Sequence, residues 1–278
     1  MKEVYISSIA LNGYSLEEII FIFIKNGWAL EFSSGIEYFE GLENFYINSN
    51  IKRMPHNYFP APKNPFVLNL ASNDEAIRLR SVNHCINGLK LAKKSESPFF
   101  AAHAGFCIDP QPKELGKKIL IENSFNREKN KDNFLESIFE IMKFSNEINL
   151  PFLIENNVIS QFNLYKGENP FLCCDSDEID WIYKMVNNDY FGILLDTAHL
   201  KVSCNSLKKN AENELLSIQK YIKGIHHSDN DGIIDNNLPI SNKYWFLPFL
   251  KMFSHVPHVI EVKNLTESKI KQQLKYFN

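Results

Sequence analysis

The sequence predicts a single α/β domain over residues 1–278, folded as a (β/α)8 barrel. Short apolar segments of strand length alternate with segments of helical period, and no linker interrupts the alternation. The later strand segments, PFLIE, FGILLD and HVIEV, are nearly continuous apolar runs, which suit strands buried on both faces of a parallel sheet. The length of 278 residues is close to the roughly 250 residues of one such barrel. A doubly wound open sheet is the alternative.

Eight segments have the length and apolar character of strands, and each is followed by a helix or by enough chain to form one. In chain order they are residues 4–8, 28–32, 51–56, 98–103, 151–155, 191–196, 222–227 and 258–262. Residues 66–70 form a further short extended segment. This order of elements is the one that a closed parallel barrel requires.

The first helix has a clear start and end in the sequence. Ser15, with Glu18 three residues later, predicts a capping box, and the helix is expected to end at Asn26, before Gly27. Ser72 is expected to cap the next helix. The helices predicted after the first are residues 73–94, 131–149, 177–186, 212–221, 244–253 and 267–275.

The composition narrows the classes of function. The 30 basic and 33 acidic side chains give a net charge of −3, which argues against a strongly basic nucleic-acid binder but leaves a local basic groove open. Five cysteines without framework spacing favour a reducing compartment. The start lacks a signal-peptide pattern, and the most apolar run, residues 19–24, is far shorter than the roughly 20 residues that span a bilayer. We therefore expect a soluble cytoplasmic protein with no membrane partner.

Polar residues of metal-binding type stand where the predicted strands end. From the third strand onward they are His56, His103, Glu155, Asp196 with His199, His226 with His227, and Glu261. In a barrel these ends converge on one face, where active sites form. Any single one of them can be an ordinary core histidine or a salt-bridged glutamate. Several at successive strand ends favour a shared site, because zinc or manganese would neutralise carboxylates and bind imidazoles that are costly to bury unpaired.

Other chemistry has less support. No Gly-x-Ser-x-Gly or glycine-rich phosphate motif occurs, and Cys107 has only its strand-end position in its favour. His84 is interpreted as a structural residue of helix 73–94, and His255 and His258 as surface residues. Three basic residues are candidates to bind a phosphate group: Arg127, Lys201 and Lys263.

Seven short motifs occur in order at these positions. They are His56-Asn57-Tyr58, Leu68-Asn69-Leu70-Ala71-Ser72, His103-Ala104-Gly105, Ile154-Glu155-Asn156, Leu195-Asp196-Thr197-Ala198-His199, the segment GIHHSD from Gly224, and Ile260-Glu261. Together they resemble the xylose isomerase-like barrel superfamily. That superfamily contains sugar and sugar-phosphate isomerases and epimerases, and also the endonuclease IV type of abasic-site nuclease.

The epimerase branch implies one divalent metal ion, zinc or manganese, held by four residues that match Glu155, Asp196, His226 and Glu261. The resemblance also implies that Glu155 and Glu261 are the catalytic acid/base pair, which moves a proton beside a carbonyl through an enediolate. His226 is favoured over His227 as the ligand on the motif match, because adjacent side chains of a strand point to opposite faces.

The nuclease branch implies further metal ligands. His56 and His103 match a first pair that Glu155 would bridge, and His199 and Asp235 match part of a third-metal set. Asn237 stands where that set has a histidine, and an amide is a poor zinc ligand. Residues 30–35, LEFSSG, resemble instead the second strand of sugar isomerases.

The sequence therefore predicts a metal-dependent sugar or sugar-phosphate isomerase or epimerase with a small-molecule sugar as its partner. In this interpretation a second ion or the substrate would contact four further residues: His56, His103, His199 and Asp235. The first alternative is a metal-dependent phosphodiesterase of the endonuclease IV type, acting on abasic DNA. The second is a catalytically silent barrel that binds a sugar or a protein. The sugar, its phosphorylation and the formation of a homo-oligomer are left open.

Overall fold

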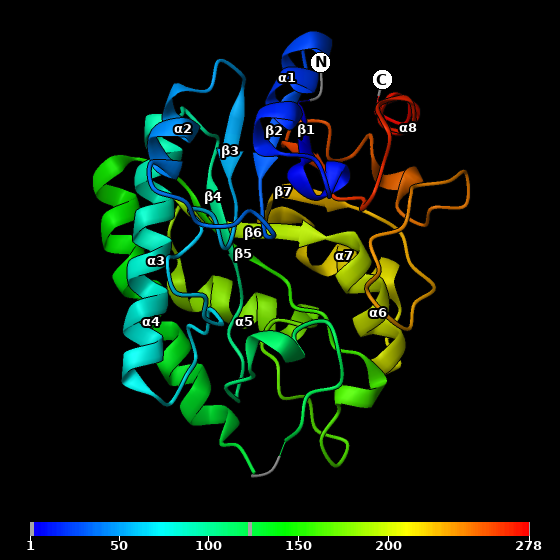
Figure 1. Ribbon diagram of the computed structural model, residues 1–278. Helices are drawn as coiled ribbons and strands as arrows, with labels where there is room; N and C mark the ends of the chain where they lie inside the picture. Colours follow the sequence, from blue (N-terminus) through cyan, green and yellow to red (C-terminus); the bar gives the residue numbers. More distant parts are fainter. Residues whose placement is uncertain (1–2, 122–123, 278) are drawn as a thin grey trace.

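The structure is a computed structural model that describes residues 3–121 and 124–277 (Figure 1). Its described part contains eight parallel strands in one sheet, in the order β3-β2-β1-β8-β7-β6-β5-β4. They are β1 Val4–Ser7, β2 Ala29–Phe32, β3 Arg53–Pro55, β4 Phe100–His103, β5 Phe152–Glu155, β6 Phe191–Asp196, β7 Ile222–His227 and β8 His258–Ile260. Strands β3 and β4 are the two ends of this order, and the barrel closes between them, where the Asn57 amide donates to the carbonyl of Ala101 at 2.8 Å. The predicted (β/α)8 barrel is confirmed, as are its eight strands to within a few residues.

Helices surround the sheet, as Figure 1 shows. The α-helices are α1 Leu16–Asn26, α2 Leu42–Asn48, α3 Glu75–Lys94, α4 Arg127–Ile148, α5 Ser176–Val186, α6 Thr197–Leu207, α7 Ala211–Ile218 and α8 Glu267–Leu274. The predicted capping box is present at α1, where the Glu18 amide donates to Ser15 Oγ and the Ser15 amide donates to the Glu18 carboxylate. Gly27, with φ of 65°, ends this helix in the left-handed conformation.

The helices differ from the sequence prediction in four places. The predicted helix 244–253 is a series of turns around a short 3-10 helix, Leu247–Phe249, because Pro248 lacks an amide hydrogen and restrains the residue before it. Helix α3 is capped by Asp74 rather than Ser72; the Asp74 carboxylate accepts from the amides at the helix start. Helices α2 and α6 were not predicted.

Helix α6 begins directly after β6 because Asp196 has two structural roles. It is the last residue of the strand, and it is also the N-cap of the helix, where its carboxylate accepts from the His199 amide at 2.7 Å. The turn from strand to helix therefore needs no linking residues. This arrangement holds Asp196 and His199 close to each other at the end of β6.

The strands alternate between an interior and an exterior face, and this alternation positions the polar residues. The barrel interior is filled by the side chains of Tyr5, Met54, Phe99, Ala101, Leu153, Leu194 and Val259. Residues two positions further along a strand point to the same face. Glu155, Asp196 and Glu261 each follow one of these interior residues by two positions, so they form the next layer of the interior. A larger apolar core lies between the sheet and the helices.

None of the helices in residues 3–121 and 124–277 has both the length and the apolar character to cross a membrane.

Candidate metal centre

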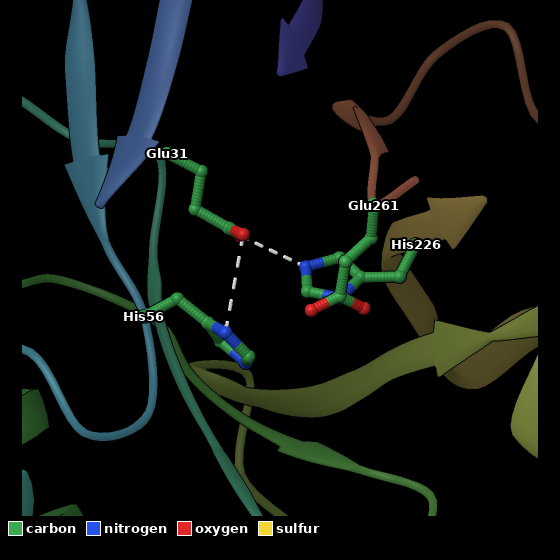
Figure 2. Close-up of side chains that lie close together, drawn as sticks. All are labelled: Glu31, His56, His226 and Glu261. Carbon is green, nitrogen blue, oxygen red and sulfur yellow. Dashed lines mark hydrogen bonds and ion pairs between the residues drawn. The ribbon is translucent and has the colours of Figure 1, made fainter. Parts of the chain in front are cut away.

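The polar layer lies at the C-terminal ends of the strands, and its members are mostly buried. Glu31, His56, Glu155, Asp196 and His226 are each at most 3% exposed. Figure 2 shows how Glu31, His56, His226 and Glu261 approach one another. Side chains from six strand ends therefore meet in one small volume, as the sequence predicts for a barrel.

The four residues predicted to hold one metal lie together. Glu155, Asp196, His226 and Glu261 each offer one ligand atom, and these atoms lie within 4.8 Å of one another. They come from β5, β6, β7 and the segment after β8, in the order of the sheet. Nitrogen and carboxylate oxygen in this combination are ligands that zinc and manganese accept.

Glu155 is the common neighbour of four histidines. Its Oε2 accepts from His56 Nε2 at 2.9 Å and lies 3.7 Å from His103 Nε2. Its Oε1 lies 3.5 Å from His199 Nδ1 and 3.7 Å from His226 Nδ1. Because Glu155 is 1% exposed, these imidazoles take the place of solvent around its charge.

His226 lies between two carboxylates. Its Nε2 donates to Glu31 Oε2 at 2.8 Å (Figure 2). Its Nδ1 donates to Glu261 Oε2 at 3.0 Å. Glu31 is fully buried in β2 and was not among the predicted site residues. The sequence does contain a signal for it, because Glu31 follows the inward Ala29 by two positions, as Glu155 follows Leu153.

Asp196 and His199 are held by Asn156, which follows β5. The Asn156 side chain accepts from the Asp196 amide at 2.7 Å and donates to the Asp196 carbonyl at 3.1 Å. The Asn156 carbonyl accepts from His199 Nδ1 at 2.9 Å. The other ring nitrogen of His199, Nε2, lies 3.3 Å from Asp235 Oδ2. Asn156 therefore fixes the orientation of the His199 ring.

A second group of candidate ligands shares Glu155 with the first. Ligand atoms of His103, Glu155 and His199 lie within 4.8 Å of one another, and Asp235 adjoins His199. His103 is the most accessible member, with a side chain 28% exposed. Desolvation, together with the charges of His199 and His56, lowers the pKa of His103 to about 4. His56 instead forms a group with Glu31, His226 and Glu261.

Neighbouring imidazoles stabilise the charged forms of the two candidate acid/base residues. Burial disfavours the Glu155 carboxylate, but the charges of His103 and His56 more than offset this and hold its pKa well below the ordinary value. Burial likewise opposes ionisation of Glu261, yet His226 lowers the pKa of Glu261 to about 2. Both glutamates are therefore carboxylates when no cation is bound.

The pKa values of three further groups, Asp196, His199 and His226, are raised, so each keeps its proton to a higher pH than usual. Burial raises the pKa of Asp196 well above its ordinary value. Burial opposes the imidazolium forms of His199 and His226, but nearby carboxylates, first Asp196 for His199 and Glu31 for His226, raise both pKa values well above the usual range. Without a cation, protons retained on Asp196, His199 and His226 therefore reduce the net negative charge of this buried cluster.

A separate observation, the hydrogen bonding of the buried carboxylates, also fits a divalent cation at this site. Three carboxylate oxygens in this region are buried and have no hydrogen-bond partner within the described residues: Asp196 Oδ2, Glu31 Oε1 and Asp235 Oδ1. Such oxygens are costly to bury, and a bound cation would satisfy those that reach it. Asp196 combines this unpartnered oxygen with membership of the predicted four-residue set.

The predicted surface position of His258 is wrong. His258 is fully buried on the outer face of the barrel, where its Nδ1 lies 2.8 Å from His227 Nε2 and its Nε2 donates to the Phe253 carbonyl at 3.0 Å. The segment around Phe253 covers this face, which local sequence does not reveal. His227 therefore points away from the candidate metal centre, whereas His226 points into it. His84 is buried in α3 and donates to the Asn57 carbonyl.

A cavity of about 470 Å³ opens over the second ligand group. His103, His199 and Asp235 contribute to its wall, and the other lining residues include Tyr58, Phe66, Phe106, Phe162 and Phe171. Its size is within the usual range for small-molecule sites.

The three candidate phosphate-binding residues have different environments. Arg127 contacts Glu178 and backbone carbonyls, and Lys201 contacts Asp229, so both are engaged within the fold. Lys263 does line the cavity, as does Lys117.

Comparison with known proteins agrees with this architecture. A family described as xylose isomerase-like TIM barrel matches residues 37–263. An uncharacterized protein of Methanocaldococcus jannaschii is 27% identical over 173 residues; the match covers 62% of this chain and 56% of that protein, so this chain spans little more than half of its length.

Among solved structures, a D-tagatose 3-epimerase-like protein has a TM-score of 0.71 at 19% identity, covering 100% of this chain and 98% of the other. The IolI protein with a bound zinc atom has a TM-score of 0.68 at 14% identity, with 99% and 96% covered. An AP endonuclease of family 2 from Brucella melitensis has 0.67 at 13% identity, with 100% of both chains covered. At these identities the structures show a shared fold. The family match extends over most of the chain, from the loop after β2 to beyond β8, and the chain therefore belongs to the xylose isomerase-like TIM barrel family.

Proposed function

We propose that this protein is a metal-dependent isomerase or epimerase that acts on a sugar or sugar phosphate. One observation carries the proposal: two glutamates, the buried Glu155 and the part-buried Glu261, both approach Nδ1 of His226, at 3.7 and 3.0 Å, with Asp196 in the same group. Two carboxylates at one cation site can serve both as ligands and as proton carriers. The epimerase-like neighbour supports this reading through its fold.

In this proposal the cation is zinc or manganese, held by Glu155, Asp196, His226 and Glu261. Bound there, it would polarise a substrate carbonyl and stabilise negative charge on its oxygen. The zinc atom in the related IolI structure supports a metal in this fold. The unpartnered oxygen of Asp196 supports a metal in this chain.

The two glutamates would divide the proton transfer between them. Glu155 projects from β5, and Glu261 follows β8, with β6 and β7 between those strands in the sheet. They therefore reach the centre from different directions. One would remove a proton from the carbon beside the carbonyl, and the other would return a proton to that carbon or to its neighbour. Return from the opposite side inverts the stereocentre.

His103, His199 and Asp235 would orient substrate hydroxyl groups, because they lie in the cavity wall beside the four-residue set. Lys117 and Lys263 would contact a phosphate group if the substrate carries one, since both line the same cavity. The apolar lining, which includes Phe106, would exclude water from the reacting carbon.

The first test is the metal content of protein purified without chelator, measured by elemental mass spectrometry. We expect one zinc or manganese per chain, and exchange of a substrate C–H proton with deuterated solvent when a panel of ketoses, aldoses and their phosphates is followed by NMR. Absence of metal after reloading would contradict the proposal and favour a non-catalytic sugar-binding barrel.

A second candidate function is a phosphodiesterase of the endonuclease IV type. The group of His103, Glu155 and His199 favours it, since this second ligand group shares Glu155 with the first. Asn237, which lies 3.5 Å from Ser228 Oγ through its amide nitrogen, stands against a complete third site. Two or three zinc ions per chain, with incision of an abasic-site duplex that His103→Ala abolishes, would favour this function over the isomerase.

A further inference from the structure

Glu31 makes the shortest contact to the histidine of the proposed metal site. Its Oε2 accepts from His226 Nε2 at 2.8 Å, and both side chains are fully buried (Figure 2). Glu31 is held in place by the pairing of β2 with β1, where it lies opposite Ser7, and by the Ser33 amide, which donates to Ser8 Oγ at 3.1 Å. The carboxylate therefore has a fixed position beside the ring.

The two nitrogens of His226 face different neighbours. Nε2 faces Glu31, whereas Nδ1 faces Glu261 at 3.0 Å and Glu155 at 3.7 Å. A neutral imidazole carries one N–H and one lone pair. A carboxylate at Nε2 keeps the proton there and leaves the lone pair on Nδ1, the nitrogen that faces the other proposed ligands.

We infer that Glu31 is a positioning residue: it holds the His226 ring and its Nε2–H, so that Nδ1 is the nitrogen that binds the metal. This inference rests on the proposed metal site but assigns a role to a residue outside the four-ligand set. Partners of this kind orient metal-binding histidines, and their loss typically weakens metal binding about 10- to 100-fold.

A direct ligand role for Glu31 fits the geometry less well. Glu31, His56, His226 and Glu261 do offer atoms within 4.8 Å of one another. However, Glu31 contacts His226 through Nε2, and Glu261 contacts it through Nδ1. An ion bound at Nδ1 therefore has the imidazole ring between itself and the Glu31 contact. Glu31 and Nδ1 would have to serve different ions.

The test compares zinc affinity, by competition with a chromogenic chelator, for wild type, Glu31→Ala and Glu31→Gln. We expect Glu31→Ala to bind zinc about 10- to 100-fold more weakly. Glu31→Gln should lose much less, because the amide oxygen still accepts from Nε2. Glu37→Ala, which removes an exposed carboxylate in the loop after β2, is the matched control and should be unchanged.

Wild-type affinity in a folded Glu31→Ala protein, or an equal loss in the Ala and Gln variants, would overturn the inference. If Glu31→Ala does not fold, the inference can still be tested on the wild type. Long-range 1H–15N NMR of the zinc-loaded wild type shows which nitrogen of His226 is protonated and which binds the metal. We expect a protonated Nε2 and a metal-bound Nδ1 on His226, and a metal-bound Nε2 would overturn the positioning role. A wild type that binds no divalent ion overturns the proposed function as well, whereas each of the other results leaves it standing.

Discussion

Glu155 Oε2 accepts a hydrogen bond of 2.9 Å from His56 Nε2, although the two residues are 99 positions apart in the chain. Burial opposes the charged form of His56, but Glu31 and Glu155 outweigh it and raise its pKa. The contact joins the end of β5 to the residue after β3, across the interior of the barrel. It therefore links the charge balance of the candidate metal centre to the stability of the fold.

His56→Ala should lower the free energy of unfolding of the metal-free protein by roughly 3 kcal/mol, because it removes one partner of a buried, hydrogen-bonded charge. The loss should be smaller in metal-saturated protein, since a cation also compensates Glu155. Urea denaturation with chelator and with excess zinc measures both values. The same loss in both conditions would show that Glu155 does not contact the metal.

Glu155→Gln and Glu261→Gln should each lower kcat by roughly 10²- to 10⁴-fold, the usual contribution of a positioned proton carrier. Each amide keeps the shape of the side chain but cannot accept the proton. The measurements are the steady-state rate on the sugar that the panel identifies and the far-UV circular dichroism of each variant. Glu140→Gln, on an exposed position of α4, is the control and should retain the wild-type rate. Near-normal turnover by either site variant would refute its catalytic role.

Asn156→Ala should weaken both stability and zinc binding. It leaves the buried amide of Asp196 without its side-chain partner, at a cost of about 1–3 kcal/mol, and removes one hydrogen bond to the Asp196 carbonyl. It also loosens the turn from which His199 projects. Thermal unfolding measures the loss of stability, and chelator competition measures the loss of zinc affinity. Asn146→Ala, at an exposed position of α4, is the control and should change neither. A destabilised variant with unaltered zinc affinity would limit Asn156 to a structural role.

The five cysteines should react with a thiol reagent only after unfolding. All five are free and buried, and burial raises the pKa values of Cys107 and Cys204 to about 12. Near neutral pH their thiols therefore stay protonated and poorly nucleophilic. Labelling followed by mass spectrometry, with and without denaturant, checks this. Rapid labelling of the native protein would contradict the buried positions.

The predicted cytoplasmic location stays a prediction.

Most strands and helices of the barrel can be predicted from local sequence. Strand segments such as PFLIE are apolar over their whole length, and they end in polar residues, so their type and their ends follow from neighbouring residues alone. The capping box of Ser15 and Glu18 is local in the same sense. Two errors in the predicted helices have local causes too: Asp196 ends a strand and caps a helix at once, and Pro248 interrupts a helical pattern.

The sequence by itself determined the (β/α)8 class and the convergence of polar strand-end residues on one face, because the period of a strand and the shared end of parallel strands bring such residues together. The choice of Glu155, Asp196, His226 and Glu261 among them rested on the family resemblance. Only the tertiary structure decided which atoms meet. Glu31 lies against His226 from 195 positions away, and His258 is buried by a segment whose course its own neighbours do not specify. Burial and pairing of this kind depend on how distant segments pack, and the free energy of a charge depends on those partners.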